Sequence, residues 1–126
     1  MASSSEPDRG LTEEVIKAVK EVHSVLGYGM HEGIYQGGLE VEFERREIPF
    51  RSRQELPIRY KGVILKKRYR PDFVLYDRMI LEIASAPALT QDDEAVLRSH
   101  LRICGIGQGL LANFGAPRLE VRRIVL

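Results

Sequence analysis

Two acidic side chains have types and positions that suit divalent-cation chemistry. Glu82 lies two residues before Ala84 in a short apolar stretch, so both side chains face the same side of a predicted strand. Asp72 lies near the end of the preceding predicted strand, and an antiparallel pairing can bring its carboxylate to that of Glu82. Two carboxylates at one end of a sheet can bind a hard ion such as Mg²⁺, which prefers oxygen ligands and keeps several waters.

A third carboxylate lies on a predicted helix. Glu32 precedes Tyr35 by three residues, which places both side chains on one helical face. If this helix packs on the sheet, Glu32 can serve as a third oxygen ligand. Spacing alone leaves an alternative open, because Asp and Glu are common residues and Asp72 can simply cap a turn.

Charge is distributed unevenly along the chain. The total is nearly balanced, with 19 Lys and Arg against 18 Asp and Glu, yet residues 51–70 have a net charge of +7. Lys and Arg contact nucleic-acid phosphates without reading base sequence, so this stretch is a candidate surface for DNA or RNA. The alternative is a solvated hairpin whose charges keep an edge strand from aggregating. The basic residues are Arg51, Arg53, Arg59, Lys61, Lys66, Lys67, Arg68 and Arg70.

Length and composition limit the class of protein. A chain of 126 residues with 44% hydrophobic residues suits one domain with a single core. No segment approaches the roughly 18 apolar residues of a membrane span, and residues 1–10 lack an apolar signal segment. We therefore expect a cytoplasmic protein with no membrane partner. Cys104 is the one cysteine, which excludes an internal disulfide and a cysteine-rich zinc site.

Hydrophobic periodicity predicts the elements that position these residues. Residues 1–10 are predicted to be a disordered leader, and 11–126 a single domain. Helices are expected over 11–26 with Thr12 as N-cap, over about 31–46, and over 90–104, where Thr90 and Asp93 form a capping box. An alternating pattern predicts a strand over 54–60, and further strands are predicted over 63–76, 79–84, 110–114 and 119–126, of which 79–84 and 110–114 are short apolar runs. The order ααβββαββ predicts an α/β or α+β fold, with a mixed four- to five-stranded sheet flanked by helices.

Several other residues allow more than one interpretation. Gly37 and Gly38 each cost a predicted helix roughly 1 kcal/mol relative to Ala, which suggests close packing of another backbone or of a partner chain. A homo-oligomeric structural protein is thus an alternative function. His23 is either a proton donor near the carboxylates or a half-buried histidine bonded to backbone. His100 and Cys104 have a spacing that suits a soft metal, but two ligands are too few for a site.

The segment GMHEGIY, from Gly29 to Tyr35, resembles the G-x-x-E-x-x-Y signature of a family of small bacterial proteins, the GxxExxY proteins. Similar features follow in order over roughly 11–126: EVH at 21–23, RQ at 53–54, YKG at 60–62, YRPD at 69–72, LE at 81–82 and LANFG at 111–115. That family is grouped with the PD-(D/E)XK nuclease-like superfamily. The resemblance therefore implies a restriction-endonuclease-like core.

The resemblance also implies roles for individual residues. Glu32, Asp72 and Glu82 take the catalytic and metal-binding positions, with Mg²⁺ as the expected ion and Mn²⁺ as the alternative. Ala84 replaces the lysine that helps to activate water and neutralises charge on the scissile phosphate. We therefore expect cleavage to be impaired or lost while nucleic-acid binding persists, and a weak Mg²⁺-dependent nuclease is the alternative. Val96 and His100 also depart from the family pattern. His23, Tyr35 and Gln54 match family positions.

Overall fold

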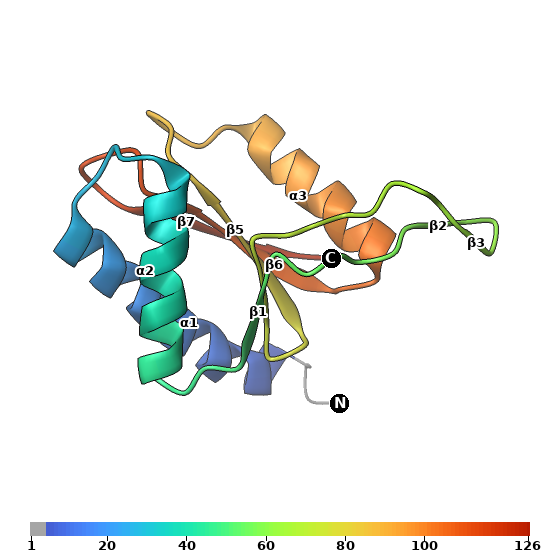
Figure 1. Cartoon of the computed structure of the whole chain (residues 1–126), viewed down its shortest axis with the longest axis horizontal. Coiled ribbons are helices and arrows are strands. Elements are labelled where there is room, and N and C mark those ends of the chain that lie inside the picture. Colours follow the sequence, from blue (N-terminus) through green and yellow to red (C-terminus); the bar gives the residue numbers. More distant parts are fainter. Residues whose placement is uncertain (1–4) are drawn as a thin grey trace.

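The computed structural model describes the backbone of residues 5–126 and the side chains of residues 8–126. Helices cover both faces of a five-stranded sheet (Figure 1). Helices α1 (Ser5–Leu26) and α2 (Glu32–Arg45) lie on one face, and α3 (Gln91–Cys104) lies on the other. Among the described residues, no helix combines the length and apolarity needed to cross a bilayer.

The sheet has the strand order β1-β4-β5-β6-β7. Strands β5 and β6 are parallel and the other neighbours are antiparallel, so the predicted mixed sheet is confirmed. A separate two-stranded hairpin consists of β2 (Arg59–Tyr60) and β3 (Val63–Ile64). The five strands of the sheet are β1 (Phe50–Ser52), β4 (Phe73–Leu75), β5 (Met79–Ala84), β6 (Gln108–Asn113) and β7 (Glu120–Val125).

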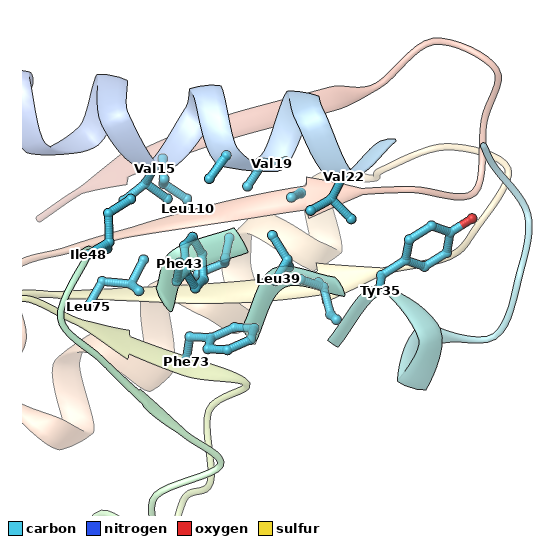
Figure 2. Packing of buried hydrophobic residues seen from close by; sticks show 14 of the residues in the cluster. Val15, Val19, Val22, Tyr35, Leu39, Phe43, Ile48, Phe73, Leu75 and Leu110 are labelled. Atoms are coloured by element: carbon cyan, nitrogen blue, oxygen red, sulfur yellow. The ribbon is translucent and has the colours of Figure 1, made fainter. Parts of the chain in front are cut away.

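The core consists of two clusters because neighbouring side chains of a strand point to opposite faces. On β5, Leu81 faces α1 and α2, whereas Ile80 faces α3. Figure 2 shows the larger cluster, in which valines of α1 and a Tyr-Leu-Phe series of α2 pack together above the sheet. The smaller cluster contains Leu97 and Leu101 of α3. Helices therefore pack on both faces of the sheet, and β4 and β5 are buried between them.

Helix α1 begins at Ser5, six residues earlier than predicted. The prediction of a disordered leader is therefore wrong for residues 5–10, and residues 1–4 lie outside the described part of the chain. Thr12 is not the N-cap: its hydroxyl donates to the Asp8 carbonyl, one turn earlier in the same helix, at 2.7 Å. The Asp8 carboxylate accepts a bond from Arg78 at 2.8 Å, and this contact with the β4–β5 turn stabilises the early turns.

The strands predicted over 54–60 and 63–76 are mostly wrong. The edge strand of the sheet is β1, and only Arg59 and Tyr60 of the first predicted strand pair in a ladder. The strand predicted over 63–76 is interrupted between β3 and β4, where residues 65–68 are exposed. The cause is that the alternating apolar residues continue onto a hairpin with no core beneath its tip, where Val63 is 65% exposed.

The α1–α2 connection is held by the tyrosine of the GMHEGIY segment. The Tyr35 hydroxyl donates to the Gly27 carbonyl at 3.0 Å and accepts from Met30 N–H at 3.1 Å. Its ring stacks on Phe114, with 4.5 Å between centroids. Tyr35 is fully buried, so its role here is to fix the start of α2 against the sheet.

The two helical glycines differ in their surroundings. A Cβ on Gly38 would lie 2.9 Å from a Leu26 methyl and 3.1 Å from a Val22 methyl, so α1 packs closely at this point. The close packing predicted for this helix is therefore confirmed at Gly38, where the neighbours are side chains of α1 rather than backbone. A Cβ on Gly37 would meet nothing within 4 Å.

The segment after β5 is fixed by Asn113 and Gly115. Asn113 is fully buried and its amide makes four hydrogen bonds: with both backbone groups of Ala86, with Gly115 N–H and with the Glu120 carboxylate, at 2.9–3.2 Å. A Cβ on Gly115 would overlap the backbone nitrogen and oxygen of Ala86. Only glycine fits there without displacing backbone, so the end of β5 has a defined position.

We expect Gly115→Ala to lower the free energy of unfolding by about 3 kcal/mol, because the added methyl overlaps backbone that cannot move aside. Gly37→Ala is the matched control: its methyl enters open space, and helix propensity should raise stability by about 1 kcal/mol. Urea denaturation of both variants measures the difference. Equal midpoints would contradict the assignment of Gly115 as a packing constraint.

Candidate active site

The register of β4 and β5 places two carboxylates side by side. Phe73 pairs with Leu81, so the next position along places Asp72 opposite Glu82. Directly opposed residues of an antiparallel pair lie on the same face of the sheet. Asp72 Oδ2 accepts a hydrogen bond from the Ile83 N–H at 2.8 Å, which closes the end of the ladder. The antiparallel pairing expected from the sequence is thus confirmed.

Glu82 is held by two aromatic partners. Its Oε2 accepts a hydrogen bond from the Tyr69 hydroxyl and lies 3.2 Å from Nδ1 of His100, a residue of α3. The Tyr69 and His100 rings are 4.2 Å apart between centroids. The Glu82 side chain is 23% exposed, so it is reachable from solvent but largely enclosed. Sequence reasoning placed neither Tyr69 nor His100 against this carboxylate.

Burial raises the pKa of both carboxyl groups. For Asp72, burial is the largest cause, the Ile83 hydrogen bond opposes it, Glu32 raises the pKa further and Arg53 lowers it. For Glu82, burial again raises the pKa, whereas the charge and hydrogen bond of His100 lower it. The local charges and hydrogen bonds thus compensate only part of the cost of burying two negative charges.

Glu32 lies at the margin of this pair. It is the first residue of α2 and is exposed, and its charge reaches Asp72 strongly enough to raise that pKa. Over residues 8–126, however, no group of three His, Cys, Asp or Glu side chains is placed to hold one metal ion. The structure therefore brings Asp72 and Glu82 together and leaves Glu32 nearby, outside a closed ligand set.

A divalent ion fits this arrangement as a two-carboxylate site. Asp72 Oδ1 and Glu82 Oε1 accept no hydrogen bond from the described residues, and burial disfavours the ionised form of both groups. Mg²⁺ is often bound through one or two carboxylates, with waters and substrate phosphates completing its shell. Asp72 and Glu82 would hold such an ion, which would supply Lewis-acid stabilisation to phosphate oxygens.

Arg53 extends this row of charges to a third strand. Ser52 pairs with Phe73, so Arg53 follows opposite Asp72, and its N–H donates to the Asp72 carbonyl at 3.1 Å. Its φ of 54° turns the backbone away from the strand at that point. Sequence analysis found Arg53 as one of eight basic residues and as part of the RQ match, without a contact to Asp72. The register shows it to be the cation that acts on Asp72.

Gln36 links α2 to the same point. Its Nε2 donates to the Asp72 carbonyl at 3.1 Å and to the Ser52 hydroxyl at 2.7 Å. The side chain is buried, and its Oε1 has no partner within the described part of the chain. The amide therefore connects α2, β1 and the start of β4 just below the carboxylate pair.

Ala84 opens into a cavity of about 150 Å³. Glu82 and Ala84 line one side, and Leu89, Val96 and Leu97 line the other. The positive groups that influence the two carboxyl pKa values are Arg53 and His100, neither of which is a lysine. Arginine is a donor only and cannot act as a base.

The remaining candidates make no hydrogen bond to either carboxylate among the described residues. His23 Nε2 bonds the Ala116 carbonyl at 3.0 Å, which matches the alternative of a half-buried histidine satisfied by backbone. Gln54 is half-buried in the connection after β1. Cys104 donates its thiol to the Leu101 carbonyl at 3.7 Å, and burial raises its pKa. These contacts give each residue a local structural role.

The arrangement of a Pro-Asp pair, a buried glutamate two residues before Ala84 and the surrounding mixed sheet matches a known family. A family model described as PD-(D/E)XK nuclease superfamily matches residues 9–124. The chain belongs to the PD-(D/E)XK nuclease superfamily. The matched residues include nearly all of the sheet and every candidate site residue named above. No curated protein sequence matches the chain significantly.

A solved structure supports the fold of this superfamily member. The crystal structure of SSO0001 matches with a TM-score of 0.59 and 18% sequence identity, over 94% of this chain and 58% of that one. At this identity the likeness shows the fold alone, which is restriction-endonuclease-like as expected. The chain spans a little over half the length of that relative.

We expect Asp72→Asn to stabilise the protein at pH 7. Asparagine can still accept the Ile83 bond, but it carries no buried charge. Because the folded-state pKa of Asp72 is raised, the folded protein binds a proton more tightly than the unfolded chain. Stability conferred by that proton is therefore lost as pH rises above about 4.

The measurement is urea denaturation between pH 4 and pH 8. The gap between Asp72→Asn and the parent should be widest at neutral pH and shrink toward pH 4. Glu13→Gln, an exposed change on α1, is the control and should leave the pH dependence unaltered. A variant less stable than the parent at every pH would refute the inferred cost of this charge.

Proposed function

We propose that the chain is a catalytically impaired PD-(D/E)XK nuclease-like domain of the GxxExxY type, which binds nucleic acid through its basic hairpin. We use "basic hairpin" for residues 51–70, which include β2 and β3. The observation that carries the proposal is Ala84, which stands two residues after Glu82 where the superfamily pattern P-D…E-x-K has lysine. The carboxylate pair is present, and the lysine of the pattern is replaced by alanine.

The missing lysine has a defined chemical consequence. Phosphodiester hydrolysis places extra negative charge on the phosphate oxygens, and a nearby lysine can neutralise it and orient the attacking water. The alanine methyl can do neither. Removal of one preorganised electrostatic partner typically costs ~10²–10³ in rate. Asp72 and Glu82 can still hold Mg²⁺ or Mn²⁺, so we propose binding of the ion without efficient cleavage.

The cations of the basic hairpin are available to phosphates. Within the described residues, Arg70 pairs with Glu55 at 2.6 Å and Arg51 with Asp77 at 3.5 Å. The other six cations have no acidic partner there, and all eight are exposed. A strongly basic, unpaired surface attracts polyanions and releases their counterions on binding. These features support DNA or RNA as the partner.

A second candidate function is assembly of identical chains. A groove of about 340 Å³ between α1 and α2 is lined by apolar side chains, of which Val25 is 70% and Val41 54% exposed. The same groove contains Glu21 and Arg45, so its charges can pair with those of a second copy. The molar mass of the protein in solution, measured with and without DNA, decides between a monomer that binds DNA and a self-assembled unit.

We expect the parent chain to show no cleavage of DNA or RNA above background with Mg²⁺ or Mn²⁺, and Ala84→Lys to gain at least about 100-fold. The cavity beside Ala84 has room for the lysine stem, so the variant should fold. Release of fluorescent fragments from labelled oligonucleotides measures the rate.

Ala84→Met fills the same cavity without charge and should remain inactive. Addition of Glu82→Gln to the lysine variant should abolish the gain. Robust cleavage by the parent chain that Glu82→Ala abolishes would show that the site is intact and the proposal wrong. If lysine restores nothing, Val96 and His100 become the positions to change next.

We expect the joint change of Lys66, Lys67 and Arg68 to alanine to weaken nucleic-acid binding at least tenfold. It should also flatten the dependence of log K on log salt by about 0.7–0.9 for each phosphate that the variant no longer neutralises. The matched control neutralises Lys17, Lys20 and Arg45, three cations on α1 and α2. Fluorescence anisotropy at several salt concentrations measures both. An equal loss in the two triple variants would indicate attraction by net charge rather than by the hairpin.

A further inference from the structure

The tip of the basic hairpin exposes apolar side chains between its cations. Tyr60 is 61% exposed, and Val63, Ile64 and Leu65 are each at least 39% exposed. Figure 1 shows the hairpin of β2 and β3 extending away from the sheet and its helices. Contiguous exposed apolar surface on a small protein usually marks a contact site. Here the apolar surface lies within the most basic stretch of the chain.

The tip has a defined backbone despite its distance from the core. Tyr60 pairs with Val63 across a two-residue turn, in which Lys61 and Gly62 have φ values of 49° and 80°. Two positive φ values are typical of the tight turns that match the twist of a hairpin. Below it, Leu65 N–H donates to the Ile58 carbonyl at 2.8 Å. The aromatic ring is therefore presented on an ordered platform.

The surroundings of the Tyr60 ring are cationic. Lys61 Nζ lies 5.5 Å from the ring centroid. Arg59 precedes it, and Lys66, Lys67 and Arg68 follow β3, all of them exposed. None of these five has an acidic partner in the described part of the chain. The exposed Tyr60 ring can stack on a base, and the unpaired cations around it can neutralise the neighbouring phosphates.

We propose that the hairpin binds single-stranded nucleic acid, with Tyr60 stacked on an unpaired base and the neighbouring cations on the phosphates. The inference rests on the proposed nucleic-acid function and names its substrate class. In a duplex the base faces are covered by their neighbours, so an exposed aromatic ring finds a partner only where bases are unpaired. Stacking on aromatic side chains contributes ~1–3 kcal/mol per base and tolerates any sequence.

The base of the hairpin leads to the carboxylate pair. Leu56 bridges Tyr69 there, with backbone bonds of 2.7 and 3.0 Å in both directions. Tyr69 donates to Glu82, and Asp72 follows three residues later. A strand that follows the cations from the tip toward this base reaches Asp72 and Glu82. The base of the binding platform is thus bonded directly to the candidate active site.

Anisotropy with a 12-nucleotide single strand and the 12-base-pair duplex of the same sequence tests the inference at one salt concentration. We expect the single strand to bind at least tenfold more tightly. Tyr60→Leu should weaken single-strand binding about tenfold and leave the duplex nearly unchanged, whereas Tyr60→Phe should bind as the parent does. Tyr28→Leu, at a tyrosine 55% exposed in the α1–α2 connection, is the matched control.

A second readout reports stacking itself. The chain contains no Trp, so Tyr60→Trp introduces a single indole at the tip. Its fluorescence should be quenched by the single strand and not by the duplex. Because this signal is local, it separates loss of stacking from loss of fold.

Three results would overturn the inference. Equal binding of strand and duplex, unaffected by Tyr60→Leu, would leave nucleic-acid binding standing and remove the single-strand preference. Tighter, Tyr60-dependent binding to anionic phosphatidylglycerol vesicles than to either oligonucleotide would make the hairpin a membrane-surface contact. Failure to bind any nucleic acid would instead reject the proposed function, and with it this extension.

Discussion

The pairing of β4 with β5 places the two carboxylates of the candidate site opposite each other. Its last rung is a bond from the Ile83 N–H to the Asp72 carboxylate, so a side chain takes the place of a backbone acceptor. The same register continues to β1, which brings Arg53 opposite Asp72, and Asp72 in turn lies opposite Glu82. A shift of one residue would turn these side chains to the other face, into the apolar cluster beneath α1 and α2.

Glu82 connects the two proposed activities of the molecule. One of its partners, Tyr69, belongs to the base of the basic hairpin, and the other, His100, belongs to α3. Through Tyr69, the base of the hairpin is therefore bonded directly to the carboxylate. Ala84, two residues further along β5, lines a cavity beside Glu82. Glu82 therefore has hydrogen-bond donors from other elements but no charged neighbour on its own strand.

Much of the fold could be predicted from local patterns, whereas the contacts of the site could not. The Thr90–Asp93 capping box and the short apolar run of β5 are local signals, and both are confirmed. The strand predicted over 63–76 failed because periodicity records which residues are apolar, not whether a core lies beneath them. Arg53, Tyr69 and His100 meet the carboxylates only through strand register and helix packing. Spacing in the sequence contains no direct record of those contacts.

The fold does not require a negative charge at Asp72 or at Glu82. Asp72 accepts a bond from a backbone amide, and Glu82 accepts one from a tyrosine hydroxyl. Asparagine and glutamine could accept the same bonds without burying a negative charge, and burial raises the pKa of both acids. Because a buried charge is unfavourable unless it is paired, the excess charge favours a partner that is itself cationic. The raised pKa values of both acids are therefore consistent with the proposed binding of a cation between Asp72 and Glu82.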